Sequence, residues 1–79
     1  MDKPSVKTIK VRVQKRVLEM AKSLRDEEYR IMIRVPLPDN YFVKLRHAYN
    51  GNVISIIGNY NTEVVRLFRN GKLRHKEKV

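Results

Sequence analysis

The sequence predicts an α+β fold, a small single domain in which about two helices pack on an antiparallel sheet that ends in a C-terminal β-meander or hairpin. Residues 29–35 alternate between polar and apolar side chains, as a half-buried strand does. Residues 14–27 repeat apolar side chains at helical spacing. The pair Asn70-Gly71 separates two apolar and basic segments and favours a two-residue type I′ turn. Together these patterns predict helices on one side of an antiparallel sheet.

The chain has 79 residues, which fit one domain over residues 1–79, and we expect residues 1–5 to be disordered. A domain of this length buries about 60 to 65% of the surface of its unfolded chain. Its core is therefore too small to enclose a deep substrate cavity. Hydrophobic residues make up 42% of the chain, which is enough for a packed core.

Several classes of site and location are disfavoured by composition. The chain has no Cys and two His, which excludes disulfides and argues against a structural zinc site, so we expect no metal and no cofactor. No apolar run approaches the roughly 20 residues that a membrane span needs. The start Met1-Asp2-Lys3-Pro4 lacks the apolar core of a signal peptide. We therefore expect a cytoplasmic protein that does not bind membranes.

The segment over residues 5–27 permits two interpretations. Residues 9–13 alternate like a strand and are rich in β-branched side chains, which favours a strand there. From Gln14 to about Glu27 an apolar helical stripe faces a charged side. We predict a strand followed by a helix, with one long amphipathic helix as the alternative. The acidic run over residues 26–28 indicates a solvated boundary at the helix end.

The next segment begins with a strand over residues 29–35, which ends before Pro36 because proline cannot donate to a sheet ladder. Residues 38–40 then resemble a helix start, and Asn50-Gly51 resembles a helix stop. We predict a helix between them, with Tyr41, Leu45 and Tyr49 on one face. A strand over residues 41–46 is the alternative, because Tyr41 and Leu45 also fit a period of two.

The C-terminal part predicts three consecutive antiparallel strands near residues 53–57, 63–69 and 72–78. A two-residue turn at Asn70-Gly71 fixes the register of the last two strands. The pairs that this register predicts are Phe68 with Leu73, Leu67 with Arg74, Arg66 with His75 and Val65 with Lys76. Apolar residues then occur on both faces, so either face of this meander can be the buried one.

Charge gives the strongest indication of function. The net charge is +10, and residues 40–79 hold 8 basic but only 2 acidic side chains, against 10 and 6 in residues 1–39. A basic ribbon about as wide as a nucleic-acid groove indicates a polyanionic partner. We predict that aromatic Tyr60 is exposed for stacking, and that Phe42 and Phe68 belong to the core. The predicted nucleic-acid-binding residues are Lys44, Arg46, Tyr60, Arg66, Arg69, Lys72, Arg74 and Lys76.

A family resemblance covers residues 29–57. The run Ile31-Met32-Ile33-Arg34-Val35-Pro36, a helix candidate to Tyr49, then Gly51 and Ser55 resemble the strand, helix and second-helix start of ribbon-helix-helix repressors. That resemblance implies an intertwined dimer with a two-stranded ribbon in the major groove. It would assign Arg30, Met32 and Arg34 to base edges and make the protein a transcriptional repressor. Gly58, Asn59 and Asn61 depart from the pattern, because they are poor helix formers.

Catalysis has little support in the sequence. It holds no nucleophile elbow, P-loop, dinucleotide fingerprint or paired-carboxylate motif, so we expect no enzyme. Metal-free RNA cleavage, as in a ribonuclease toxin, is the one alternative, with His47 or His75 as the proton-transfer group. Each His is flanked by basic residues, which also fits a surface that contacts phosphates.

The sequence therefore predicts a small basic DNA- or RNA-binding protein with a regulatory or architectural role, which contacts phosphates through its C-terminal hairpin. A homodimer is compatible with so small a core. A different class of function is a small inhibitor or adaptor that binds an acidic protein surface by adding a strand to its sheet.

Overall fold

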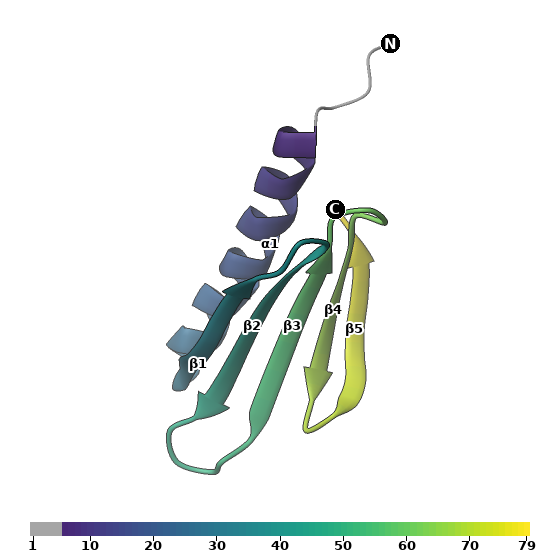
Figure 1. The fold of residues 1–79 in the computed structure, drawn as a ribbon. Helices are drawn as coiled ribbons and strands as arrows, with labels where there is room; N and C mark the ends of the chain where they lie inside the picture. Colours follow the sequence, from purple (N-terminus) through teal and green to yellow (C-terminus); the bar gives the residue numbers. More distant parts are fainter. Residues whose placement is uncertain (1–5) are drawn as a thin grey trace.

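The computed structural model describes residues 6–79, and the expectation of disorder over residues 1–5 lies outside the described residues. One helix packs on a five-stranded antiparallel sheet in which the strands follow one another in chain order (Figure 1). The elements are α1 (Val6–Asp26), β1 (Tyr29–Pro36), β2 (Asn40–His47), β3 (Val53–Asn59), β4 (Val64–Arg69) and β5 (Lys72–Lys78). The predicted α+β class is confirmed, and the prediction of two helices is wrong for the described chain.

The first element is the long helix that was the alternative for residues 5–27, so the predicted strand over residues 9–13 is wrong. Val13, Val17 and Ala21 are buried against the sheet, and Ile9 packs at the edge of the same core. This four-residue spacing runs through the β-branched segment without a break. Burial of the stripe outweighs the local β preference, because tertiary packing overrides propensity.

The acidic run marks the end of the helix, as predicted. The backbone N–H of Glu27 donates to the Leu24 carbonyl at 2.9 Å, and that of Glu28 donates to the Arg25 carbonyl at 3.2 Å. Glu28 has a φ of 70°, a left-handed conformation that ends helices and redirects the chain. The chain then enters β1, which covers the predicted strand and ends at Pro36, one residue later than expected.

The predicted second helix is wrong, and residues 40–47 form β2, close to the alternative strand over residues 41–46. Tyr41, Val43 and Leu45 are buried in strict alternation, which is the period of a strand. A tight connection after β1, in which the Leu37 N–H donates to the Asn40 carbonyl at 2.8 Å, returns the chain antiparallel. The ribbon-helix-helix fold is therefore also wrong, because strands occupy both segments that it requires to be helical.

The three C-terminal strands are confirmed, and Asn70 and Gly71 have φ values of 49° and 84°, as a type I′ turn requires. The predicted pair Phe68 with Leu73 is correct. The other predicted pairs are wrong by one residue, because a bulge follows Leu73. The observed pairs are Leu67 with His75, Arg66 with Lys76 and Val65 with Glu77. A bulge reverses the facing of every later residue relative to an unbulged strand.

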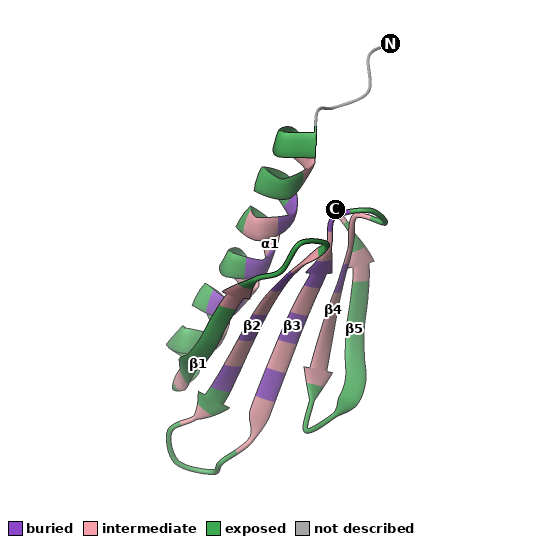
Figure 2. Ribbon diagram, in the orientation of Figure 1, coloured by how far each residue is buried: buried purple, intermediate pink, exposed green. Residues whose placement is uncertain are grey.

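The core lies between α1 and the central strands, and Figure 2 shows the two edge strands β1 and β5 largely exposed. The buried residues are Val13, Val17, Ala21, Tyr41, Val43, Leu45, Ile54, Ile56, Tyr60 and Val65. Gly58 in β3 allows the helix to approach the sheet closely. A Cβ at this position would overlap Val13 Cγ1 and lie 3.0 Å from Val17 Cγ2.

An ion pair joins the helix to the far edge of the sheet. Arg16 Nη2 donates to Glu77 Oε1 at 2.9 Å, and Arg16 Nε donates to Glu77 Oε2 at 3.1 Å. This hydrogen bond with Arg16, together with a weaker one from His75, holds the pKa of Glu77 below its usual value. The same hydrogen bond raises the pKa of Arg16.

Candidate nucleic-acid interface

The helix covers one face of the sheet, and the other face has no element on it within residues 6–79 (Figure 1). Because side chains alternate along a strand, the residues next to buried Tyr41, Val43 and Leu45 point to this uncovered face. Directly paired residues of neighbouring strands point to the same face of the sheet. The register therefore identifies the residues of the other strands that also point to the uncovered face. We call this surface the open face.

The open face mixes cations with apolar side chains. Its residues are Arg30, Ile33, Val35, Asn40, Phe42, Lys44, Arg46, Val53, Ser55, Ile57, Asn59, Val64, Arg66, Phe68, Leu73, Lys76 and Lys78. No Asp or Glu is among them. The central residues Phe42, Ile57 and Phe68 are half-buried by their neighbours. The open face therefore combines basic side chains with apolar ones that are partly accessible.

Cross-strand rows alternate the two chemical types. One row runs Phe42, Ile57 and Arg66 across β2, β3 and β4. The adjacent row runs Lys44, Ser55 and Phe68 across the same strands. Each aromatic ring therefore has a cation as a close neighbour, either along its own strand or diagonally across it.

Like charges also face each other on this surface. Arg30 in β1 is the direct partner of Arg46 in β2, and Arg66 in β4 is the direct partner of Lys76 in β5. Like charges placed directly opposite destabilise a sheet. No carboxylate of residues 6–79 forms an ion pair with any of these four cations. Within residues 6–79 these four cations are therefore left without a carboxylate partner.

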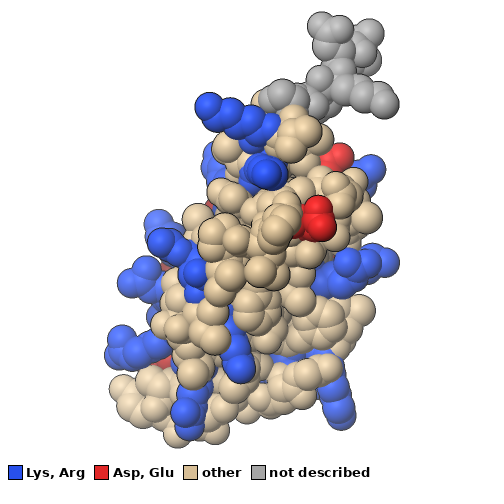
Figure 3. Space-filling model, in the orientation of Figure 1, with Lys and Arg blue, Asp and Glu red and all other residues tan. Residues whose placement is uncertain are grey.

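The acidic side chains of the described chain lie elsewhere. They occupy α1, the α1–β1 turn, the β1–β2 and β3–β4 connections, and the helix-facing side of β5, at Glu19, Asp26, Glu27, Glu28, Asp39, Glu63 and Glu77. In Figure 3, where the sheet lies in front of the helix, blue groups border the view on both sides and cross its lower part. Red areas are few, the largest near the upper end.

The structure places only part of the predicted site together. The predicted residues that lie on the open face are Arg30, Lys44, Arg46, Arg66 and Lys76. Arg69 and Lys72 pair beside the Asn70-Gly71 turn at the end of the sheet. Arg74 is the bulged residue of β5, and Arg34 lies opposite buried Val43, on the helix-facing side.

The aromatic predictions are reversed. Tyr60 is 6% exposed and belongs to the core, where its hydroxyl accepts a hydrogen bond from Gln14 Nε2 at 2.9 Å, so the prediction of an exposed ring is wrong. Phe42 and Phe68 are half-buried on the open face, so their assignment to the core is also wrong. Gly58 and Asn59 belong to the end of β3, and Tyr60 begins the turn that follows, with its ring buried.

We predicted Tyr49 on one face of a helix, and that prediction is wrong, because Tyr49 lies in the loop that joins β2 to β3. Tyr49 in this loop is 81% exposed. His47 Nδ1 accepts hydrogen bonds from the backbone N–H groups of Tyr49 and Asn50, each at 3.1 Å. These two hydrogen bonds to His47 fix the loop backbone. In the sequence, the only sign of this exposed ring is an aromatic residue just before Asn50-Gly51.

The two histidines do not form a shared site. His47 and His75 lie on β2 and β5, strands that are separated by β3 and β4. His47 Nδ1 accepts two backbone N–H groups, and His75 Nε2 lies 2.9 Å from Glu77 Oε1. Within residues 6–79 no group of three or more His, Cys, Asp or Glu is arranged to hold a metal ion. No described helix is long and apolar enough to cross a membrane.

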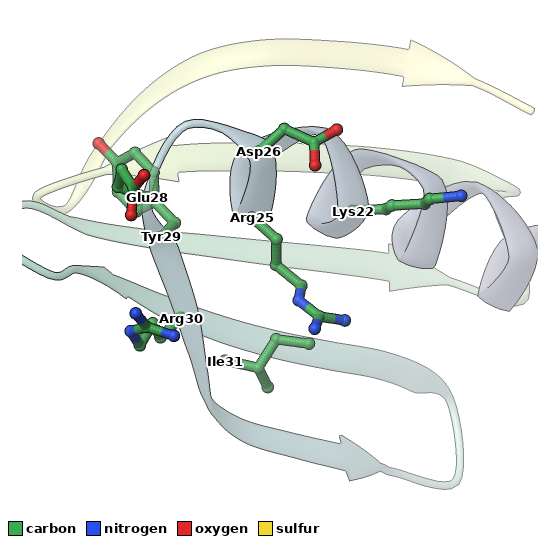
Figure 4. Close-up of a pocket in the computed structure, with 7 residues that line it drawn as sticks. All are labelled: Lys22, Arg25, Asp26, Glu28, Tyr29, Arg30 and Ile31. Carbon is green, nitrogen blue, oxygen red and sulfur yellow. The ribbon is translucent and has the colours of Figure 1, made fainter.

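A polar hollow lies between the end of α1 and the start of β1 (Figure 4). Arg25 extends alongside Ile31 there, and Asp26 and Glu28 partly balance the nearby cations. Mixed charge of this kind does not select an anion.

Comparison with known proteins found no matching family model, no matching curated protein and no matching solved structure. The role of the open face is therefore inferred from its own chemistry.

Proposed function

We propose that the protein binds nucleic acid through the open face of its sheet. The observation that carries the proposal is an uncovered sheet face with Arg and Lys beside aromatic rings and without a carboxylate. Nucleic-acid-binding surfaces need cations for phosphates and flat apolar groups for bases. Such a surface contacts the backbone without reading a sequence, which fits a regulatory or architectural role.

A second copy of the chain is a poor occupant of this face. Two copies packed face to face would bring together two surfaces that each carry Lys44, Arg46 and Arg66 and no carboxylate. The net charge of +10 adds long-range repulsion to that local cost. A polyanion would be attracted where a second copy is repelled, because it neutralises the cations of the open face and releases its own counterions.

The helix offers a weaker alternative surface. Its exposed cations include Lys7, Arg12 and Lys22, but Glu19 and Asp26 lie among them and the helix has no aromatic residue. Those cations are therefore a matched control for charge without aromatic neighbours. Neutralising three cations of the helix or three cations of the open face lowers the net charge of the protein by the same amount.

The test compares two triple variants in fluorescence-anisotropy titrations of a labelled single strand and a labelled duplex at several salt concentrations. One variant carries Lys44→Gln, Arg46→Gln and Arg66→Gln, and the control carries Lys7→Gln, Arg12→Gln and Lys22→Gln. We expect the open-face variant to bind more weakly and its salt slope on single strands to fall by about 2, from three lost phosphate contacts. The helix control should keep the wild-type slope.

Equal losses in the two variants would contradict the proposal, because they would mean attraction by net charge alone. Failure of the wild-type protein to bind either nucleic acid at low salt would also contradict it. Binding to an acidic protein under those same conditions would then favour the inhibitor or adaptor alternative.

A further inference from the structure

Next to the open face lies a hollow formed by the start of β1, the end of β2 and the β2–β3 loop. It is lined by Arg30, Met32, Arg46, His47, Tyr49 and Gly51. Arg30 and Arg46 belong both to this hollow and to the open face, so the two are continuous. We infer that the hollow holds one unpaired base of a single-stranded nucleic acid, with its ring against Tyr49 and its phosphate near the two arginines.

The aromatic ring in this hollow is both exposed and supported. The Tyr49 ring meets the His47 ring edge to face, with centroids 5.9 Å apart, and His47 in turn meets Tyr29 with centroids 4.9 Å apart. The Tyr49 backbone N–H is bound by His47 Nδ1. A ring held in this way loses little conformational freedom when a base stacks on it.

The loop backbone is fixed independently of that histidine. Gly51 has a φ of 75°, which favours glycine, and the Asn52 N–H donates to Asn50 Oδ1 at 2.9 Å. Asn70 Nδ2 donates to Asn52 Oδ1 at 3.2 Å, which ties the loop to the β4–β5 turn. These hydrogen bonds and the left-handed Gly51 define the shape of the loop that borders the hollow.

The arginines supply the anion-binding side. Arg30 and Arg46 face each other directly, and Arg46 Nη2 lies 3.9 Å from the position that a Cβ on Gly51 would take. The Arg46 guanidinium thus reaches the loop that carries Tyr49. A phosphate placed between the arginines would relieve their repulsion, and its attached base would lie next to the Tyr49 ring and Met32.

This geometry selects a single strand over a duplex. In a duplex the bases are stacked and paired, so only phosphates and groove edges reach a protein surface. A hollow that pairs an exposed ring with two guanidinium groups gains from a base only when that base is unpaired. The inference rests on the proposed function and adds the ligand class, single-stranded DNA or RNA.

The test separates bases from phosphates. Wild type, Tyr49→Ala and Tyr49→Phe are titrated with labelled oligothymidylate, with an abasic sugar-phosphate oligomer of equal length, and with a duplex of equal length. We expect Tyr49→Ala to weaken oligothymidylate binding about tenfold, as loss of one stacked base does. Binding of the abasic oligomer and the duplex should be unchanged, and Tyr49→Phe should match wild type.

Equal binding of oligothymidylate by wild type and Tyr49→Ala would overturn the inference while leaving the proposed function intact. An equal loss on all three probes would overturn it too, because it would show that Tyr49 acts on the fold or the phosphate contacts. Absence of wild-type binding to every probe at low salt would instead contradict the proposed function.

Discussion

At the scale of single residues, Gly58 decides how closely the helix can approach the sheet. It lies in β3, and its missing side chain leaves space that Val13 and Val17 of α1 occupy. Its φ is not in the left-handed region, so the need for glycine here is one of space and not of backbone conformation. This close contact brings the helix against the covered face of the sheet, opposite the proposed binding surface.

We expect Gly58→Ala to destabilise the protein by about 1 to 3 kcal/mol, because its Cβ would overpack the contact with the two valines. Urea denaturation measures the change in the free energy of unfolding. In a Val13→Ala background the same substitution should cost less, since the closest clash is gone. Ser55→Ala on the opposite face of β3 is the control and should stay within about 0.5 kcal/mol. Additive effects of Gly58→Ala and Val13→Ala would refute this explanation.

At the scale of elements, the sequence predicts strands better than helices. The hairpin at Asn70-Gly71 was predictable because a type I′ turn needs positive φ at two neighbouring residues, and few sequences supply it. The strand predicted over residues 9–13 was wrong because β-branched residues of a helix can also alternate with polar ones over five positions. The helix predicted between residues 38–40 and Asn50-Gly51 was wrong because these apparent start and stop signals lie at the two ends of β2 and in its flanking connections. In both segments, burial against a partner element decided the outcome.

The register of the hairpin could not be predicted fully for a related reason. The bulge after Leu73 has no distinctive residue type in the sequence, yet it sets which side chains of β5 reach the open face. Without it, Arg66 would face His75 instead of Lys76. The basic character of the candidate site was thus predictable from charge. Which residues belong to the site depended on the bulge and on the burial of Tyr60.

The contact between α1 and β5 makes a pH-dependent contribution to stability. The folded pKa of Glu77 lies below the usual 4.5, first because of its hydrogen bond with Arg16. The ion pair therefore stabilises the fold above that unfolded value, and the contribution is lost as the pH falls through the lower folded value. Both side chains are partly exposed, which limits the effect to less than about 1 kcal/mol.

We expect Glu77→Gln to lower the melting temperature at neutral pH, and the difference from wild type to shrink as the pH falls below 4.5. Thermal unfolding followed by circular dichroism over a pH series measures it. Glu27→Gln, at an exposed residue of the α1–β1 turn, is the control and should leave stability nearly unchanged. A destabilisation by Glu77→Gln that persists undiminished at acid pH would show that the ion pair is not its cause.

At the scale of the whole molecule, the protein has two chemically different sides. One side carries a helix with Glu19 and Asp26 among its cations and no aromatic residue, and the other is a bare sheet face whose cations lie among aromatic and aliphatic groups. The close packing at Gly58 and the ion pair at Glu77 hold the helix on its side of the sheet. The open face and the adjoining hollow at Tyr49 are therefore available together for one extended ligand.

The most direct test of this sidedness is a map of backbone amide chemical shifts in ¹⁵N-labelled protein during titration with unlabelled oligothymidylate. We predict progressive shifts in β2, β3, β4 and the β2–β3 loop, including Tyr49, while the exposed helix residues Lys7, Arg12 and Lys22 remain near their starting positions. Shifts concentrated on α1, with the open face and its loop unchanged at saturating oligonucleotide, would contradict the account.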